Sequence, residues 1–395
     1  MDNKSKEVVI VSAIRTPIGA YKGSLKNLKS DQLETIVIKE VLNKSNFIKD
    51  EVDEVIMGQV LTTGAGQNPA RQAAINAGIP ISKPAYLINQ VCGSGLRAVI
   101  AGYQSIKLGE SINVISGGQE NMSIAPHSIF FRDQKKISED ELLDTMINDG
   151  LIDAFNKYHM GVTAENVAEK FQITRNQQDR FALQSQEKAV IAQKENKFKN
   201  EIVSLKIKSK NAQVDFNKDE HPREGISMEA LQRLKTAFQK DGTVTAGNAS
   251  GINDGAAAVV LMSKEESEKR GIKPLAEIKS WASCGVDPSV MGTGPIPSSK
   301  KALEIAGWKS KDLDLIEANE AFAAQSCAVV KELSLPMEKV NVNGGAIAIG
   351  HPIGASGTRI FVTLIHEMLK RDSKKGLATL CIGGGMGVAM CIERK

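Results

Sequence analysis

The stretch Gln90-Val91-Cys92-Gly93-Ser94-Gly95-Leu96 decides the fold, because it predicts a sharp turn from a strand into a helix. The apolar run at residues 85–88 predicts a short buried strand, and apolar residues at helical spacing after the turn predict a helix that ends at Gly109. The amides and the positive dipole end of such a helix favour a thiolate over a thiol. Cys92 is therefore a candidate nucleophile, and a buried structural thiol is the equally open alternative.

Composition bounds the class of protein. The 395 residues contain 42% hydrophobic and 24% charged side chains, which is typical of a globular chain of two or three domain equivalents. The net charge of +4 is small and the lysines are scattered, so we expect no nucleic-acid partner. Five cysteines at scattered positions fit neither a disulfide framework nor zinc-ligand spacing. We therefore expect no bound metal and a reducing compartment.

No targeting or membrane segment is evident. The apolar run at residues 8–11 is too short for a signal-peptide core and continues into Arg15-Thr16-Pro17. No apolar run approaches the length of a membrane span, and residues 393–395 are not a peroxisomal signal. We expect a cytoplasmic protein with no membrane partner.

Strand and helix patterns alternate through the first third of the chain. We expect strands at 8–12, 55–58 and 113–116, the last ending at Gly117-Gly118, and helices at 33–42 and 68–77. This alternation predicts an α/β fold with a mainly parallel sheet and helices on its faces.

Residues 121–245 are more polar and predict a mainly helical insertion, in which Thr174 and Gln177 form a capping box. A strand at 257–262 returns to the buried pattern. We therefore expect a first α/β half at 1–120 and 246–268, an insertion at 121–245, and a second α/β half at 269–395.

The last section repeats the order of the first. It is expected to contain helices at 300–306 and 358–369 and strands at 340–342 and 378–382. Gly354-Ala355-Ser356-Gly357 opens a helix as Cys92-Gly93-Ser94-Gly95 does, and Gly383-Gly384-Gly385 follows a strand as Gly117-Gly118 does. The shared order predicts a duplicated α/β unit, with chance similarity between α/β units as the alternative.

Three further residues stand where chemistry is expected. His351 lies in a glycine-rich loop, Cys381 ends a predicted strand before three glycines, and Asn319 stands at another strand end. Each alone is compatible with a structural role. Because ligands of α/β folds bind at the carboxyl ends of strands, these residues and Cys92 form a candidate active site.

Four blocks, in this order and spacing, resemble the thiolase family. They are Gln90-Val91-Cys92-Gly93-Ser94-Gly95, Asn319-Glu320-Ala321-Phe322-Ala323, Gly344-Gly345-Ala346-Ile347-Ala348-Ile349-Gly350-His351-Pro352 and Cys381-Ile382-Gly383-Gly384-Gly385. The resemblance runs nearly end to end. It implies two similar βαβαβαββ halves stacked as five α-β-α-β-α layers, with the insertion as a loop domain over a coenzyme A site.

The resemblance implies roles for the four candidates. Cys92 would be the acylated nucleophile, with a pKa lowered by His351 and the helix amides. Cys381 would move the α-proton of acetyl-CoA, because the pKa of an ordinary thiol lies near the working pH. One oxyanion hole would combine His351 with a water held by Asn319, and the other would use the backbone amides of Cys92 and Gly383.

The resemblance also implies contacts to coenzyme A. Ser250 would lie along the pantetheine and Arg223 near the adenine, although Ala230 stands where a serine is expected. His159 resembles the branch that takes short acyl groups. The residues expected to wall a pocket for little more than an acetyl group, or to bind coenzyme A, are His159, Met160, Met291, Ala246, Phe238 and Phe322.

The implied reaction is the reversible condensation of two acetyl-CoA molecules to acetoacetyl-CoA and coenzyme A through acyl-Cys92. Coenzyme A would be a substrate, with no other cofactor. A degradative 3-ketoacyl-CoA thiolase of broad chain length is the alternative within the family. An acyl-CoA or lipid-carrier binding protein is the non-enzymatic alternative, and a cysteine hydrolase is a last option. The resemblance also implies a homotetramer or homodimer.

Overall fold

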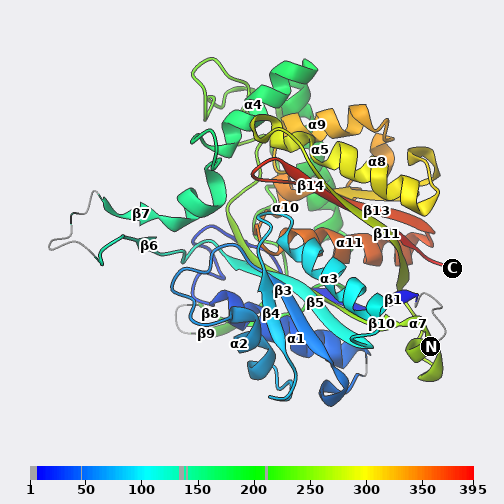
Figure 1. Ribbon diagram of the computed structural model, residues 1–395. Coiled ribbons are helices and arrows are strands. Elements are labelled where there is room, and N and C mark those ends of the chain that lie inside the picture. The colour runs from blue at the N-terminus through cyan, green and yellow to red at the C-terminus, as the bar shows by residue number, and fades with distance from the viewer. Residues whose placement is uncertain (1–6, 46, 133–137, 139–140, 210–211) are drawn as a thin grey trace.

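The computed structural model describes residues 7–45, 47–132, 138, 141–209 and 212–395, and its strands form two similar half-sheets (Figure 1). In the first half the order is β4-β3-β5-β10-β1, formed by Ala85–Ile88, Glu54–Gly58, Asn113–Asn121, Asn253–Ser263 and Val8–Arg15. β3 is parallel to β4 and β5, while β10 is antiparallel to β5 and β1. A two-residue strand, β2 (Gly19–Ala20), also pairs with β10.

The second half repeats this arrangement. Its order is β12-β13-β14-β11, formed by Leu315–Ala318, Lys375–Ile382, Met386–Glu393 and Ala276–Gly285. β12 is parallel to β13, and β14 is antiparallel to both its neighbours. Val340 makes one parallel bridge to Ile316, in the position that β4 takes beside β3. Two residue pairs between β1 and β11 join the halves into one sheet.

The expectation of a mainly parallel sheet is wrong. Among the strands that the structure describes, β3–β4, β3–β5 and β12–β13 pair in parallel, and the other neighbouring strands of this sheet are antiparallel. β13 and β14 are joined only by residues 383–385, and so short a loop permits only antiparallel pairing. Gly384 and Gly385 adopt φ of 82° and 85° in this turn, so the glycine run marks a hairpin.

Three finer expectations also differ from the structure. Residues 340–342 form a single bridge rather than a strand. β5 continues through Gly117-Gly118 to Asn121 instead of ending at 116. β4 lies at the edge of the sheet, where Tyr86 is 40% exposed, so this strand is not buried.

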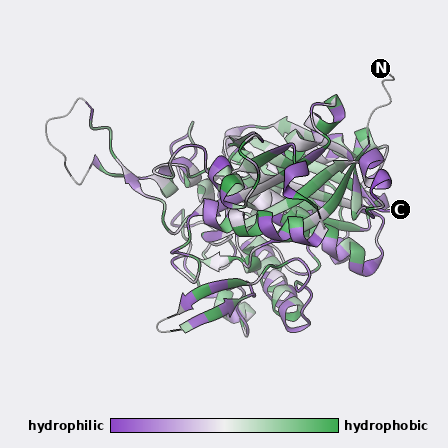
Figure 2. Ribbon diagram, turned by 90° about the horizontal axis from the view of Figure 1, so that it is seen from below, coloured by the Kyte–Doolittle hydropathy of each residue, from purple (hydrophilic) through white to green (hydrophobic). Residues whose placement is uncertain are grey.

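Helices form three layers around the half-sheets (Figure 1). The outer layer of the first half holds α1 (Ser30–Ser45) and α2 (Pro69–Asn76), the central layer holds α3 (Ser94–Leu108) and α11 (Ser356–Arg371), and the outer layer of the second half holds α8 (Pro295–Ala306) and α9 (Ala323–Glu332). Figure 2 shows the apolar segments gathered in this layered body. These are the five α-β-α-β-α layers that the family resemblance implies. Within the part of the chain that the structure describes, every helix is too short or too polar to cross a membrane.

The insertion between β5 and β10 contacts both halves, since residues 160–171 pack against α9 and Leu205 lies in the apolar cluster of the first half. It holds α4 (Met160–Phe171), α5 (Arg175–Lys194), α6 (Met228–Gln232), a π-helical turn at Met146–Leu151, and the strand pairs β6–β7 (His127–Ser128, Leu143–Asp144) and β8–β9 (Leu205–Ser209, Ala212–Phe216). Two further short helices, α7 (Lys264–Lys269) and α10 (Ala346–Ile349), lie outside it. α5 begins at the predicted Thr174–Gln177 capping box. The strand pairs were not expected, because side chains of β9 are largely exposed and give no buried-strand pattern. The domain boundaries stay a prediction.

Candidate active site

A strained turn presents Cys92 at the start of α3. Val91 has φ of 46°, a left-handed conformation that β-branched residues rarely adopt. Ser94 stabilises the turn, because its Oγ donates to the Val91 carbonyl (2.6 Å) and accepts from the Gln90 amide (2.9 Å). A Cβ on Gly93 would lie 2.4 Å from Cδ1 of Ile382, so this glycine permits the close approach of β13. The turn therefore brings Cys92 next to the β13–β14 hairpin.

The backbone amides of Gly383 and of Cys92 itself act on the thiol of Cys92 and lower its pKa. These are the two amides predicted to form an oxyanion hole. Burial nevertheless dominates and raises the pKa of Cys92 to about 11, with Glu120 adding to the rise. The expectation that the pKa of Cys92 is lowered is therefore wrong for the free protein, in which the residue is a thiol.

His351 is fixed in one tautomer. Its Nδ1 lies 2.5 Å from Oγ of Ser356, and the Ser356 hydroxyl donates to the Pro352 carbonyl (2.8 Å). Because that hydroxyl proton is used, Ser356 accepts from Nδ1–H, and Nε2 of His351 carries the free lone pair. Burial and the positive charge of Arg359 lower the pKa of His351 to about 3, so the imidazole is a neutral base.

Asn319 and Cys381 lie beside these two groups. Nδ2 of Asn319 is 3.5 Å from Nδ1 of His351. Cys381 is fully buried in one apolar cluster with Met160 and Met291. Burial and then the neighbouring Cys92 raise the pKa of Cys381, so its pKa is not near the working pH as we expected.

A cavity of about 330 Å³ opens onto Cys92. Ten of the thirteen predicted site residues line it, namely Cys92, His351, Gly383, Ser250, His159, Met160, Met291, Ala246, Phe238 and Phe322. Cys381 and Asn319 are buried behind its wall. The structure therefore brings twelve of the predicted site residues to this cavity or directly behind it, and one residue lies apart.

That residue is Arg223, which is exposed and absent from the cavity lining. Its backbone amide donates to Oε1 of Gln186 (2.9 Å), and its charge lowers the pKa of His221 after burial does. His221 lies against Gly251, because a Cβ there would be 2.4 Å from the ring. Arg223 is thus outside the cavity, two residues from a histidine at its edge.

Aromatic rings form one wall of the cavity. The ring of Phe238 stacks on His159 with centroids 4.5 Å apart and meets Phe322 edge-on at 6.2 Å. Nδ1 of His159 accepts from the amide of Gly161 (3.0 Å), and a Cβ on Gly161 would lie 2.1 Å from Phe238. Gly161 therefore allows the wall to close.

Sequence reasoning missed several contributors. Ser356 was noted only as part of a helix opening, although it orients His351. The lining residues not anticipated are Val91, Met122, Gly150, Leu151, Ala237, Ala249, Gly251, Ile252, Ala321 and Ile353. Several of them adjoin predicted site residues in sequence, and this proximity was the available signal.

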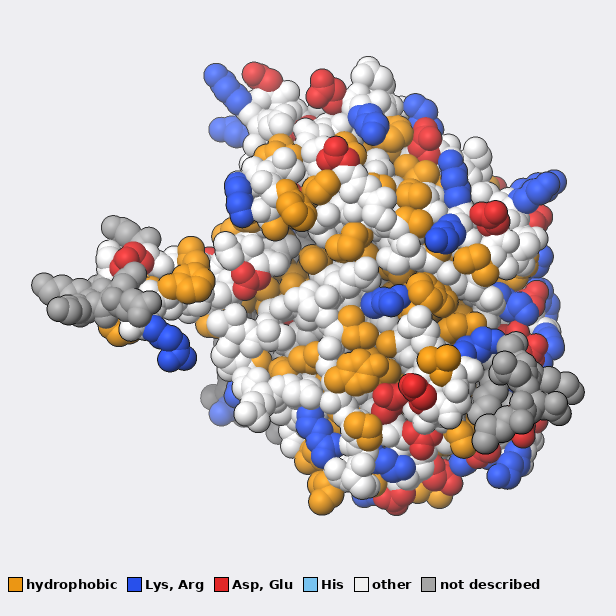
Figure 3. Space-filling view, in the orientation of Figure 1, with side chains coloured by type: hydrophobic (Ala, Val, Ile, Leu, Met, Phe, Trp, Pro, Cys, Tyr) orange, Lys and Arg blue, Asp and Glu red, His pale blue; other side chains and the backbone are white. Residues whose placement is uncertain are grey.

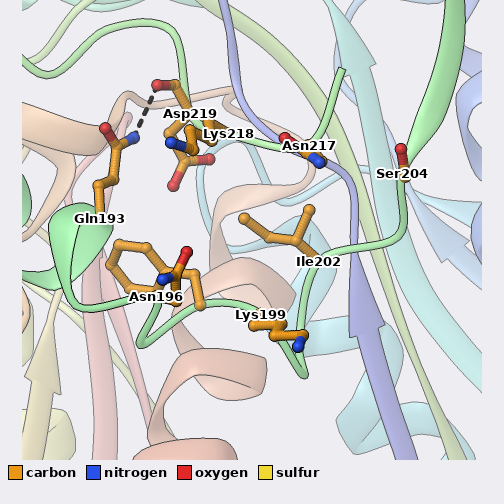
Figure 4. A pocket seen from close by; sticks show the side chains of 9 residues that line it. Gln193, Asn196, Lys199, Ile202, Ser204, Asn217, Lys218 and Asp219 are labelled. Carbon is orange, nitrogen blue, oxygen red and sulfur yellow. Dashed lines mark hydrogen bonds between the residues drawn. The ribbon is translucent and has the colours of Figure 1, made fainter. Parts of the chain in front are cut away.

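A second cavity shows that size alone does not locate the site. It measures about 440 Å³ and is lined by residues such as Gln193, Asn196, Lys199 and Asp219 (Figure 4). Gln193 donates to the backbone carbonyl of Asp219 across it. Its described lining contains neither cysteine nor histidine. Among the described residues there is also no group of three histidine, cysteine or acidic side chains arranged for a metal ion.

Comparisons with known proteins identify the family of this chain. Residues 8–265 match the N-terminal domain of thiolase, and residues 272–394 match its C-terminal domain. The chain therefore belongs to the thiolase family.

Individual relatives match along almost the whole chain. Acetyl-CoA acetyltransferase of Paracoccus denitrificans is 58% identical over 388 residues, covering 98% of this chain and 99% of that protein. The crystal structure of the Bacillus anthracis acetyl-CoA acetyltransferase has a TM-score of 0.97 at 46% identity, covering 99% of this chain and 100% of that chain. Human mitochondrial 3-ketoacyl-CoA thiolase in complex with CoA has a TM-score of 0.94 at 41% identity, covering 99% and 98%.

Proposed function

We propose that this chain catalyses the reversible condensation of two acetyl-CoA molecules to acetoacetyl-CoA and coenzyme A. The observation that carries the proposal is the surroundings of Cys92. Cys92 lines a cavity of about 330 Å³ together with His351, and the backbone amides of Gly383 and of Cys92 itself lower its pKa. Full-length relatives named acetyl-CoA acetyltransferase support the choice of substrate.

In the first half-reaction Cys92 attacks the acetyl thioester. As the sulfur attacks, its proton passes to Nε2 of His351, which is unprotonated because Nδ1–H is donated to Ser356. The backbone amides of Cys92 and Gly383 would stabilise the oxyanion. The imidazolium then protonates the departing sulfur of coenzyme A, which leaves acetyl-Cys92 and a neutral histidine.

In the second half-reaction Cys381 takes the α-proton of another acetyl-CoA, and the resulting carbanion attacks acetyl-Cys92. The thiol of Cys381 must first lose its proton, and neutral His351 is the base that would accept it. Acetylation assists this step, because it removes the ionisable Cys92 that raises the pKa of Cys381. The proton held by His351 passes to the sulfur of Cys92 when acetoacetyl-CoA departs, and the starting state is restored.

The cavity supports a short acyl group. Met160 and Met291 are buried beside Cys381, and the His159–Phe238 stack closes the adjacent wall. A broad-chain 3-ketoacyl-CoA thiolase is the second candidate, and the human neighbour with that name favours it. The test is coenzyme A-dependent cleavage of acetoacetyl-CoA and of a 3-ketoacyl-CoA with eight carbons, by the parent and by Cys92→Ala.

Cleavage restricted to acetoacetyl-CoA and lost in Cys92→Ala is the expected result. Equal cleavage of both substrates would assign the chain to the second candidate. Tight binding of acyl-CoA without turnover would favour a binding protein, and release of free acetate would favour a hydrolase. Activity that survives in Cys92→Ala would overturn the mechanism.

We also propose a cytoplasmic homotetramer or homodimer that uses coenzyme A only as substrate. The five cysteines are unpaired, which suits a reducing compartment. Apolar side chains near β6 and β7 are exposed, including Phe130 at 84% and Leu142 at 42%, and apolar side chains are visible on the projecting arm in Figure 3. Such exposure favours self-association. Sedimentation equilibrium would test it, and a monomer at micromolar concentration would contradict it.

A further inference from the structure

The cavity in Figure 4 lies in the insertion, where the end of α5 meets the end of β9, and the proposed reaction does not use it. Its volume of about 440 Å³ falls in the ~300–1,000 Å³ range of small-molecule sites. Two segments form it, residues 193–204 and 217–219, and none of its described lining residues also lines the cavity at Cys92. The β8–β9 pairing joins the segments, and Nε2 of Gln193 donates to the carbonyl of Asp219 (2.7 Å). The insertion therefore builds a second, separate cavity.

This part of the chain has more cations than its own carboxylates neutralise. Residues 193–219 contain seven lysines and four acidic residues. All four acids already have partners, and the ion pairs are Glu195–Lys197, Asp215–Lys206, Asp219–Arg15 and Glu201–Arg15. Lys199 and Lys218 are exposed, line the cavity, and form no ion pair with another described residue. The cavity therefore carries two unneutralised positive charges, one from each segment.

Asp219 is the acidic residue of the described lining, and its charge is already matched. Nη1 and Nη2 of Arg15 donate to its two carboxylate oxygens (2.7 and 2.9 Å), and the amide of Ile18 donates to Oδ1 (2.8 Å). These bonds satisfy the carboxylate. An anion that enters the cavity therefore meets the two lysines without an opposing unpaired acid in the described lining.

The neutral lining residues suit the body of an organic anion. The side-chain amides of Asn196 and Asn217 have no hydrogen-bond partner among the described residues, and Phe198 and Ile202 add apolar surface. Figure 4 shows Asn196 and Lys199 on the side of the cavity opposite Asn217. An amide offers both a donor and an acceptor, which is the pattern on the edges of nucleobases. The ammonium group of lysine binds phosphate as a point charge. The lining therefore combines groups for a base with groups for a phosphate.

We propose that this cavity binds a nucleotide, whose phosphates contact Lys199 and Lys218 and whose base contacts the asparagine amides. The nucleoside fills the volume that inorganic phosphate leaves empty. A dicarboxylate would satisfy the lysines but would give the amides and Phe198 no planar partner. The proposal is independent of the proposed function, because neither lysine lines the cavity at Cys92.

The test uses methyl NMR of the full chain with ¹³C-labelled isoleucine. Ile202 lines this cavity and Ile252 lines the cavity at Cys92, so each methyl signal reports on one of the two sites. The signals are assigned from Ile202→Val and Ile252→Val. ADP is the probe. Pyrophosphate, which has the phosphates without the nucleoside, and citrate are the comparison anions, all titrated at one ionic strength.

Two double variants separate a defined site from general attraction to a basic surface. Lys199→Ala with Lys218→Ala removes the two unpaired charges of the lining. Lys197→Ala with Lys206→Ala is the matched control, because it removes two lysines of the same region that already pair with acids and do not line the cavity. None of the four lysines is buried, and unfolding midpoints check that both variants stay folded.

We expect ADP to shift the Ile202 signal with a Kd below about 1 mM, and pyrophosphate and citrate to bind at least roughly tenfold more weakly. The first double variant should weaken ADP binding roughly tenfold, and the control by less than about threefold. An unmoved Ile202 signal at about 10 mM ADP, equal binding of pyrophosphate or citrate, or equal weakening in the control would overturn the proposal. A shift confined to Ile252 would overturn it as well, because the nucleotide would then occupy the catalytic cavity. Acetoacetyl-CoA cleavage is measured on the same samples, and its absence would refute only the proposed function.

Discussion

Replacing Ser356 by alanine isolates the hydrogen bond that sets the tautomer of His351. Oγ of Ser356 lies 2.5 Å from Nδ1 of His351 and donates to the carbonyl of Pro352. The variant leaves a buried N–H without its acceptor, and the imidazole can then adopt the tautomer that protonates Nε2. We therefore expect a loss in the acylation of Cys92.

The size of this loss follows from the charge on His351 in the transition state. A hydrogen bond to a charged group contributes about 1.5–3 kcal/mol. Because each 1.36 kcal/mol on the barrier is tenfold in rate, the acylation rate should fall roughly 10- to 150-fold. The assay is single-turnover acetylation of Cys92 by acetyl-CoA, followed by mass spectrometry, together with kcat for cleavage of acetoacetyl-CoA.

Ser298→Ala is a closely matched control. Ser298 is also fully buried in a helix, and its hydroxyl donates to the carbonyl four residues earlier, that of Gly294 (2.7 Å). Both variants lose that backbone bond, but only Ser356→Ala changes His351. An acylation rate in Ser356→Ala within twofold of the Ser298→Ala rate would refute the reasoning about the tautomer.

Three other predictions concern packing and ionisation. Gly161→Ala should push Phe238 off its stack and destabilise the fold by about 1–3 kcal/mol, with a higher KM for acetoacetyl-CoA; an unchanged KM would contradict the role of this wall. Burial raises the pKa of Glu120 from 4.5 to about 7. The free energy of unfolding of the parent should therefore fall by about 3 kcal/mol as the pH rises through this range. In urea titrations of Glu120→Gln the free energy of unfolding should not show this fall. The same pH dependence of that free energy in both proteins would contradict the prediction. Alkylation of Cys92 by iodoacetamide should accelerate up to about pH 11, and a plateau near neutrality would show a thiolate in the free protein.

The parts of the site that sequence predicted are those with local signals. The turn at Cys92, the strand end before the glycine run at 383–385 and the capping box of α5 depend on residues close in the chain. Whether a strand pairs in parallel or antiparallel depends on which distant strand becomes its neighbour, and the local sequence does not show this. The alternation of strands and helices therefore predicted a mainly parallel sheet, which the structure does not have. The thiol pKa values were wrong for a similar reason, because burial in the folded chain outweighs the helix amides next to Cys92. The buried charge of Arg359 gave no signal in the sequence, since charged residues usually lie at the surface.

The duplication explains why one site contains groups from both ends of the chain. α3 and α11 open with equivalent segments, Cys92–Gly95 and Gly354–Gly357, and a Cβ on Gly95 would lie 2.7 Å from Oγ1 of Thr358 and 3.0 Å from the carbonyl of Gly354. Both serines donate to a carbonyl in the turn before their helix, Ser94 to that of Val91, three residues earlier, and Ser356 to that of Pro352, four residues earlier. Only Ser356 also contacts a histidine. The first half supplies the nucleophile Cys92 and the second supplies the base His351, so neither half is expected to turn over without the other.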